Sequence, residues 1–410
     1  MKTARLVAVL FLLAASGGIV GYMSLRTPYA GFRGVTLVEI PRGAGTRAMG
    51  SILADAGVIR YPWQFIAARA LRPAATLQAG EYRFDRPAPV WDVFDRLARG
   101  DVFFHELVVP EGHNLFDIAG SLEKLRVAAA AGFLQVARDP SPIRDLAPEA
   151  QTLEGYLFPD TYRVSRQTSA EELCRRMTGR FRVAWAELGA GAPVHRTVTM
   201  ASLVEKETAV AEERQQVAAV FINRLRRNMR LQSDPTIIYG ITGGERQLDR
   251  PIRRSDISES TPYNTYRIDG LPPTPIANPG REAIAAVLQP GTTDHLYFVA
   301  DGSGGHAFAT TLNEHNANVR RWRATEQEAA SEPAGKDGGP DEPAAEDLEA
   351  PIPADVSVPV PGETDARREK VDEIMASAAG PTEADSPEPD PAVNLNQRPI
   401  PLPKPKPQRD

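Results

Sequence analysis

Two glutamates lie two positions apart in a stretch whose composition favours a helix, from Met200 to Val210. Residues three, four and seven positions apart share one face of a helix, so Glu205 and Glu207 must lie on different faces. The neighbours of Glu207 on its face are mostly apolar, whereas those of Glu205 are smaller and more polar. This pattern predicts that Glu207 points toward the core or a cleft, and that Glu205 has more polar surroundings.

A carboxyl group held among apolar side chains has a raised pKa, because desolvation disfavours its anion. Glu207 could therefore stay protonated near neutral pH and act as a general acid. The alternative is a glutamate at the edge of the core, satisfied by a hydrogen bond or by an arginine such as Arg214. Helix geometry leaves both interpretations open.

Short polar motifs rich in proline and glycine follow this stretch, and they combine tyrosines with amide and hydroxyl side chains. Aromatic faces pack on the C–H groups of sugars, while amides and hydroxyls pair with sugar hydroxyls. An earlier segment, residues 154–162, combines carboxylates with aromatic residues, and is equally consistent with a buried aromatic turn and with a saccharide-contacting loop. The candidate glycan-binding residues are Gln232, Asp234, Tyr263, Asn264 and, with less support, Glu154.

These motifs occur together, in order, in a known family. The chain resembles the endolytic murein transglycosylases of the MltG/YceG type, from its N-terminal apolar segment to about Trp322. The resemblance rests on the motifs at residues 200–209, 220–225, 231–236, 263–266, 271–273, 276–280, 297–300, 308 and 315–316.

The resemblance implies a function and a catalytic residue. The catalytic glutamate of the family is followed by threonine, which corresponds to Glu207 here. The implied reaction cleaves the bond between N-acetylmuramic acid and N-acetylglucosamine inside a glycan strand and leaves a 1,6-anhydro end, with no metal or other cofactor. A LysM-like subdomain, a lysozyme-related active-site helix, peptidoglycan polymerases as partners and a role in ending nascent strands are also implied.

Two other functions fit the same residues. In a hydrolytic muramidase, a second carboxylate such as Asp234 would activate water, because glycoside hydrolysis normally uses two carboxylates. In a membrane-anchored scaffold, the chain would bind peptidoglycan without cleaving it.

The predicted fold is α+β with several parts. Residues 35–84 have the pattern strand, helix, helix, strand, and helices are expected at 90–97, 114–125, 169–188 and 197–227. A hairpin in the core sheet is expected from His295 through Phe308. The predicted domains are a cytoplasmic stub and anchor (1–26), a LysM-like subdomain (35–86), a helical connecting region (87–150), a mixed α/β catalytic domain (151–324) and a tail (325–410).

The N-terminal segment predicts a membrane anchor. Leu6 to Leu25 carry no charge and follow Lys2 and Arg5. As a helix they would span roughly 30 Å, the thickness of the hydrocarbon core. The positive flank predicts a cytoplasmic N-terminus, a single span and a catalytic domain in the periplasm. A cleaved signal peptide is the alternative, because small residues follow the first part of the apolar run.

Composition bears on the C-terminal tail, on nucleic acid as a partner and on metal binding. Residues 331–410 hold 18 acidic and 8 basic residues, a net charge of −10, which leaves +4 for residues 1–330. The same segment has 16 prolines and no aromatic residue, which predicts a disordered acidic tail. The ordered part is not strongly basic, so nucleic acid is not an expected partner. A single cysteine and six histidines without metal-ligand spacing predict no metal site.

Overall fold

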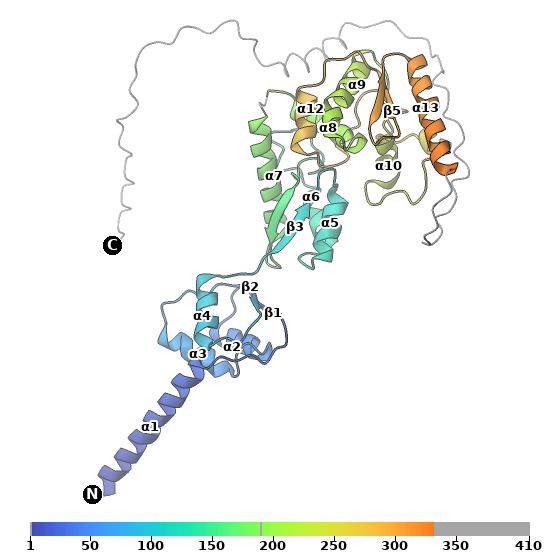
Figure 1. Ribbon diagram of the computed structural model, residues 1–410. Coiled ribbons are helices and arrows are strands. Elements are labelled where there is room, and N and C mark those ends of the chain that lie inside the picture. Colours follow the sequence, from blue (N-terminus) through green and yellow to red (C-terminus); the bar gives the residue numbers. More distant parts are fainter. Residues whose placement is uncertain (1, 189–190, 332–410) are drawn as a thin grey trace, which may run out of the picture.

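The structure is a computed structural model and describes residues 2–188 and 191–331. Along the chain, a long N-terminal helix leads into a small module, and a larger body follows (Figure 1). The helix is α1 (Lys2–Arg26), which contains one segment, Val9–Arg26, long and apolar enough to cross a membrane.

The small module (residues 36–99) has the strand, helix, helix, strand order predicted for this region. Its elements are β1 (Thr36–Ile40), α2 (Thr46–Asp55), α3 (Pro62–Leu71), β2 (Gly80–Phe84) and α4 (Val90–Arg99). The strands pair antiparallel, with Val38 opposite Tyr82. Helix α4, predicted to belong to the connecting region, instead buries Val90, Val93 and Leu97 in the core of this module, because these residues form one apolar stripe.

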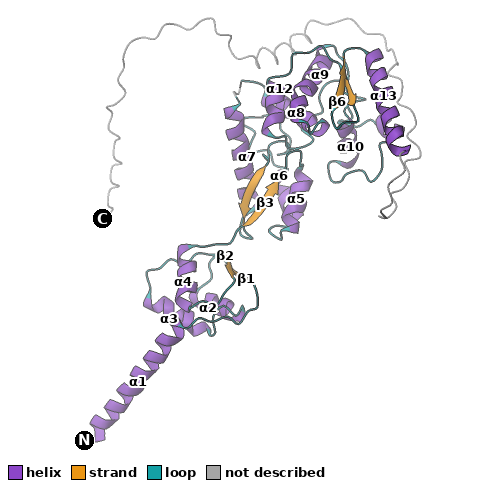
Figure 2. Cartoon of the chain, viewed as in Figure 1, coloured by secondary structure: helices purple, strands orange, loops and turns teal. Residues whose placement is uncertain are grey.

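The body begins with an antiparallel pair of strands that lies beside helices (Figure 2). These elements are β3 (His105–Val109), α5 (Leu115–Lys124), α6 (Ala130–Ala137), β4 (Asp160–Val164) and α7 (Ala170–Glu187). Strand β3 pairs antiparallel with β4, and one hydrophobic core continues through the predicted domain boundary at residue 150. The predicted helical connecting region is therefore part of the body, because β3 completes a sheet with a strand from beyond that boundary.

Helix α8 lies at the centre of the body's second half. This half contains α8 (Val194–Glu207), the 3₁₀ turn η1 (Ala211–Glu213), α9 (Arg214–Arg226), α10 (Asp234–Thr242), α11 (Arg254–Ser258) and α12 (Arg281–Leu288). All residues of α8 from Thr197 to Val204 are buried, and α8 packs against α9, α10 and α12. A helix buried on every side is held firmly by its neighbours, so its last turn is a rigid platform.

The prediction of one helix over residues 197–227 is wrong, because the helix stops at Glu207. Thr208 is extended, with φ −140° and ψ 132°, and its Oγ1 accepts a hydrogen bond from the backbone N–H of Val210. Threonine competes with helical hydrogen bonding in this way through its side chain. Glu207 therefore occupies the C-terminal end of a helix, where its surroundings come from other segments.

The body ends with a hairpin and a long helix. Strands β5 (Tyr297–Ala300) and β6 (His306–Ala309) pair antiparallel as predicted. Among the described residues they form a two-stranded sheet of their own rather than part of a core sheet. Helix α13 (Leu312–Ser331) covers residues 325–331, which were predicted to belong to the tail. The rest of the predicted tail, residues 332–410, lies outside the described residues.

The turn at Gly155 tests how tightly the body is packed around α8. Gly155 has φ +88°, and a Cβ there would overlap Pro275 and lie 2.9 Å from Val198 Cγ1 of α8. We expect Gly155→Ala to lower the free energy of unfolding by about 2–4 kcal/mol, through strain and overpacking. In Gly179→Ala the new methyl group meets nothing within 4 Å, inside α7. The free energy of unfolding of this control, measured by chemical denaturation, should rise by about 0.5–1 kcal/mol. Equal stability of the two variants would contradict the tight packing around Gly155.

Candidate active site

Glu207 is the last residue of α8, and its side chain is only partly exposed. Its Oε1 accepts a hydrogen bond of 2.5 Å from Ser233 Oγ, at the N-cap position of α10. Desolvation, as the largest effect, raises the pKa of Glu207 to about 7; the Ser233 hydrogen bond and Arg224 oppose this rise, while Asp234 adds to it. The C-terminal end of a helix also disfavours an anion. Glu207 can therefore both donate and accept a proton near neutral pH.

The residues next to Ser233 are positioned by a second segment. The backbone N–H of Ser233 donates to Thr265 Oγ1 at 2.9 Å, and that of Gln232 donates to the Thr265 carbonyl at 3.2 Å. Thr236 Oγ1 also lies 2.9 Å from Thr265 Oγ1. The segment around Thr265 thus holds the loop that presents Ser233 to Glu207.

The buried side chain of Arg224 also anchors the loop that presents Ser233 to Glu207. Its buried guanidinium donates through Nε to the Leu296 carbonyl at 2.6 Å, and through Nη1 to the Leu231 carbonyl at 2.9 Å and to Gln232 Oε1 at 3.2 Å. Gln232 has φ +52°, a left-handed conformation that is unusual for a residue other than glycine. Such strained positions persist only where the surroundings fix them. Arg224 supplies that constraint beside the candidate acid.

Gln232 and Asp234 flank Ser233, and both are exposed. Asp234 Oδ1 accepts a hydrogen bond of 2.7 Å from the hydroxyl of Tyr266. Asp234 is also close enough to raise the pKa of Glu207. The structure therefore brings three of the predicted site residues, Glu207, Gln232 and Asp234, to one place on the surface.

Tyr263 is partly buried and packs against Tyr239 of α10. Its ring centroid is 4.8 Å from that of Tyr239, and its hydroxyl lies 2.8 Å from Thr274 Oγ1. Tyr239 in turn donates to Glu154 Oε2 at 3.3 Å. Tyr263 therefore connects the predicted site to the core.

Glu154 and Asn264 do not reach the surface, since each is 1% exposed. Glu154 accepts from the Leu115 backbone and from Asn278 as well as from Tyr239, and burial raises its pKa to about 8. The Asn264 amide donates to the carbonyls of residues 256, 257 and 259. Both side chains fix loops, and residues 153–158 form the buried aromatic turn that was one of the two interpretations of this segment.

Glu205 lies on another side of α8 and has a structural contact. Its Oε2 accepts a hydrogen bond of 2.9 Å from the Gly280 N–H. Desolvation raises the pKa of Glu205, with a further contribution from Glu111, while the Gly280 hydrogen bond and Arg214 oppose the rise. Arg214, considered from sequence as a partner of Glu207, lies 3.9 Å from Glu111 Oε2 instead. Glu207 thus has Ser233 as its hydrogen-bond partner, and Arg214 belongs to the neighbouring cluster.

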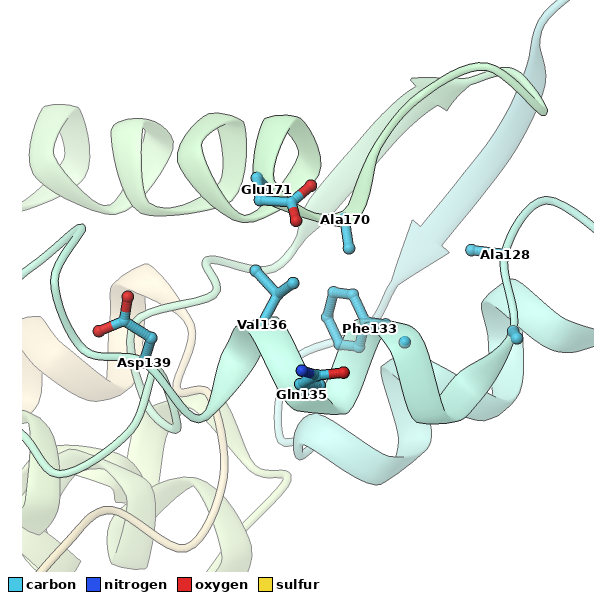
Figure 3. A pocket seen from close by; sticks show the side chains of 9 residues that line it. Ala128, Phe133, Gln135, Val136, Asp139, Ala170 and Glu171 are labelled. Carbon is cyan, nitrogen blue, oxygen red and sulfur yellow. The ribbon is translucent and has the colours of Figure 1, made fainter.

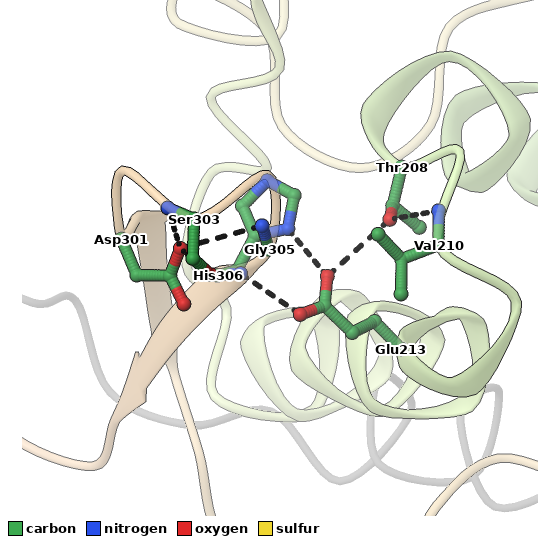
Figure 4. Close-up of polar contacts among 7 residues, drawn as sticks. All are labelled: Thr208, Val210, Glu213, Asp301, Ser303, Gly305 and His306. Atoms are coloured by element: carbon green, nitrogen blue, oxygen red, sulfur yellow. Dashed lines mark hydrogen bonds and ion pairs between the residues drawn. The ribbon is translucent and has the colours of Figure 1, made fainter.

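A polar network fixes the chain immediately after Glu207 (Figure 4). Thr208 Oγ1 donates to Glu213 Oε2 at 3.4 Å, and the same carboxylate oxygen lies 2.6 Å from His306 Nδ1. Glu213 Oε1 also accepts from the His306 backbone N–H at 2.8 Å. The β5–β6 hairpin is thereby connected to Thr208, the residue directly after α8.

Sequence reasoning did not assign roles to Ser233, Arg224, Glu213 or His306. Ser233 was within a quoted motif, and its position beside two polar candidates was the one available signal. Arg224 and Glu213 lie in a charged, helical stretch where nothing distinguishes a buried charge from an exposed one. His306 is 93 residues from its partner Glu213, a separation that no local pattern reveals.

Two further kinds of candidate ligand site are metal sites and surface hollows. Within residues 2–188 and 191–331, no three His, Cys, Asp or Glu side chains come together as a metal site. A surface hollow of about 600 Å³ lies between α6 and α7, where it is lined by Phe133, Val136, Asp139 and Glu171 among others (Figure 3). None of the predicted site residues lines it.

Comparisons with known proteins point to one family. Residues 38–321 match the YceG-like family. A protein of Bacillus subtilis named endolytic murein transglycosylase is 31% identical over 312 residues, which cover 71% of this chain and 86% of that protein. A protein of the same name from Streptococcus pneumoniae is 30% identical over 76% of this chain and 63% of its own length. The crystal structure of a putative YceG-like protein from Listeria monocytogenes is 32% identical, covers 70% of this chain and 99% of its own, and has a TM-score of 0.47.

Proposed function

We propose that this chain, which belongs to the YceG-like family, is an endolytic murein transglycosylase with Glu207 as its acid and base. The observation that carries the proposal is the position of Glu207. It ends a rigid buried helix, is partly open to solvent, bonds to Ser233 and has a pKa raised to about 7. A group that titrates near the working pH can serve in both directions of proton transfer.

In the proposed reaction, Glu207 first donates its proton to the oxygen between N-acetylmuramic acid and N-acetylglucosamine. The bond from that oxygen to muramyl C1 breaks, and the glucosamine product leaves with a hydroxyl group. The Glu207 carboxylate then takes the proton from the muramyl 6-hydroxyl, whose oxygen closes on C1 as a 1,6-anhydro ring. One carboxylate is sufficient, because no water is added.

We assign substrate contacts to the exposed side chains beside Glu207. Gln232 and Asp234 offer an amide and a carboxylate to sugar hydroxyls, and Tyr263 positions the surrounding loop. Glu154 and Asn264 support these loops from the interior rather than touching the glycan. Asp234, as an exposed carboxylate near Glu207, is also the group that would activate water in a hydrolytic muramidase.

Product mass distinguishes the two reactions. The full-length chain is incubated with uncrosslinked glycan strands, and the new ends are analysed by mass spectrometry. We expect anhydro-muramyl ends, which are lighter than reducing ends by one water. Reducing ends would establish the muramidase, whereas glycan binding without any cleavage would establish a scaffold.

The cellular setting is part of the proposal. We propose that α1 is a single-pass anchor with its N-terminus in the cytoplasm and the catalytic body in the periplasm. The small module is proposed to be LysM-like and to bind glycan, and peptidoglycan polymerases are proposed partners of an enzyme that ends strands as they are made. Reporter fusions at either end of α1 would test the topology.

The pH dependence of cleavage follows from the raised pKa of Glu207. Donation needs the protonated acid, so activity should fall as the pH rises through about 7. Ser233 stabilises the carboxylate form, and its removal in Ser233→Ala should raise the pKa of Glu207 and move the alkaline limb upward by about one pH unit. The measurement is the rate of strand cleavage against pH.

A matched control for this prediction is Ser141→Ala. Ser141 Oγ donates to Asp139 at 2.5 Å, a pair of the same type in the loop after α6. Its removal should leave the pH profile unchanged. An unshifted profile in Ser233→Ala would show that Ser233 does not set the pKa of the catalytic acid.

A further inference from the structure

The outward face of α3 is apolar, and no described residue covers it. Trp63, Ile66 and Leu71 are 46, 38 and 63% exposed, and Tyr61, immediately before the helix, is 49% exposed. Surface helices normally turn charged or polar residues outward. This helix does the opposite over its whole length, which marks an interaction surface.

Gln64, on the buried side of α3, connects this helix to the end of α1. Its Nε2 donates to Ser24 Oγ at 2.7 Å and to the Ser24 carbonyl at 3.0 Å. Leu25, the next residue of α1, is 3% exposed and packs in the core of the module. The last turn of α1 is therefore packed into the module, and these contacts set the position of the module relative to α1.

The height of α3 relative to a membrane follows from these contacts. Ser24 is the second-last residue of the uncharged run that begins at Leu6 and would span roughly 30 Å as a helix. If α1 crosses the bilayer, Ser24 lies at the outer headgroup level. Trp63 is adjacent in sequence to Gln64, the partner of Ser24, so α3 begins at that same level.

The chemistry of the face suits lipid headgroups. Tyr61 and Trp63 stack with ring centroids 6.5 Å apart, and tyrosine and tryptophan are enriched where membranes meet water. Between residues 21 and 74 there are seven arginines and only two acidic residues. Of the arginines next to this face, Arg60 is exposed, and Arg72 is exposed but paired with Asp95 of α4. Cationic side chains around an apolar centre complement an anionic membrane surface.

We propose that the exposed face of α3, formed by Tyr61, Trp63, Ile66 and Leu71, lies in the headgroup region of the outer surface of the membrane that α1 crosses. This inference rests on the proposed anchor. This second contact with the bilayer fixes the rotation of α1 and the module about the α1 axis, so the small module is held against the bilayer in one orientation.

Spin labels on single cysteines test the proposal in the full chain. Cys174 is fully buried and burial raises its thiol pKa to about 12, so the wild-type chain serves as the labelling blank. Ile66→Cys carries the test label, and Val183→Cys, on α7 at 46% exposure, is the matched control. Leu13→Cys reports the anchor. Each labelled chain is reconstituted in vesicles of phosphatidylethanolamine and phosphatidylglycerol, and collisions with oxygen and with a water-soluble nickel chelate are measured.

We expect the ratio of oxygen to nickel collisions to be severalfold higher at position 66 than at position 183. A water-like ratio at position 66 together with a bilayer ratio at position 13 would overturn this proposal and leave the anchor intact. A label at position 66 shielded from both reagents would overturn it in favour of a protein or glycan partner. A water-like ratio at position 13 would refute the anchor, and the docking of α3 with it.

Discussion

Glu207→Gln is expected to lower strand cleavage by on the order of 10²- to 10⁴-fold or more, because it removes the group proposed to donate and accept the proton. The amide oxygen can still accept the hydrogen bond from Ser233, so the shape of the site is retained. A neutral amide also avoids the cost of a desolvated anion. The variant should therefore be at least as stable as the wild type above pH 7 in thermal unfolding, while anhydro ends disappear from the products.

Glu205→Gln is the matched control for this prediction. It lies on the same helix, and its amide oxygen can still accept from the Gly280 N–H. We expect it to keep most of the wild-type activity. If Glu207→Gln cleaved at the wild-type rate, or if the two variants lost activity equally, Glu207 would not be the catalytic acid.

Arg224→Met is expected to have the second-largest effect, on both stability and activity. Methionine fills much of the volume but leaves the buried carbonyls of Leu231 and Leu296 without their donor. We expect the free energy of unfolding to fall by on the order of 3 kcal/mol. The loop that carries Gln232 and Ser233 loses its anchor, so cleavage should fall further than the folded fraction does.

Two variants separate the roles of Arg224. Arg227→Met removes an exposed arginine at the end of α9 and should leave stability and cleavage nearly unchanged. Arg224→Lys keeps the charge but not the planar fork of donors, so it should recover little activity. Full activity in Arg224→Lys would show that the positive charge, rather than the planar set of donors, is what the site needs. Full activity in Arg224→Met would refute the anchoring role. Thermal unfolding and cleavage are measured on the same samples.

Local patterns in the sequence were sufficient for several elements. The strand, helix, helix, strand order of the small module and the hairpin of β5 and β6 were each predicted, because each depends on residues close together in the chain. The choice of Glu207 over Glu205 also came from periodicity within one helix. That periodicity was sound up to Glu207, but its continuation to Arg214 was wrong, because the chain leaves the helix at Thr208.

The surroundings of each polar side chain could not be predicted in this way. Glu154 and Asn264 were predicted at the site together with Gln232, yet both are buried and bonded to segments that the sequence did not connect to them. A polar residue is stable in the interior only when partners satisfy it, and those partners lie on other elements.

What the sequence by itself determined is the type of residue available for chemistry, the helical turn that leads up to Glu207 and the family to which the chain belongs. Only the tertiary structure decided that Ser233 bonds to Glu207 and that Arg224 holds the loop that carries Ser233. The physical reason is the separation along the chain of the residues that interact. Helical and strand periodicity depends on residues that are close together in the sequence. The pKa of a catalytic acid, in contrast, depends on desolvation and on hydrogen bonds from segments that meet only when the core has packed.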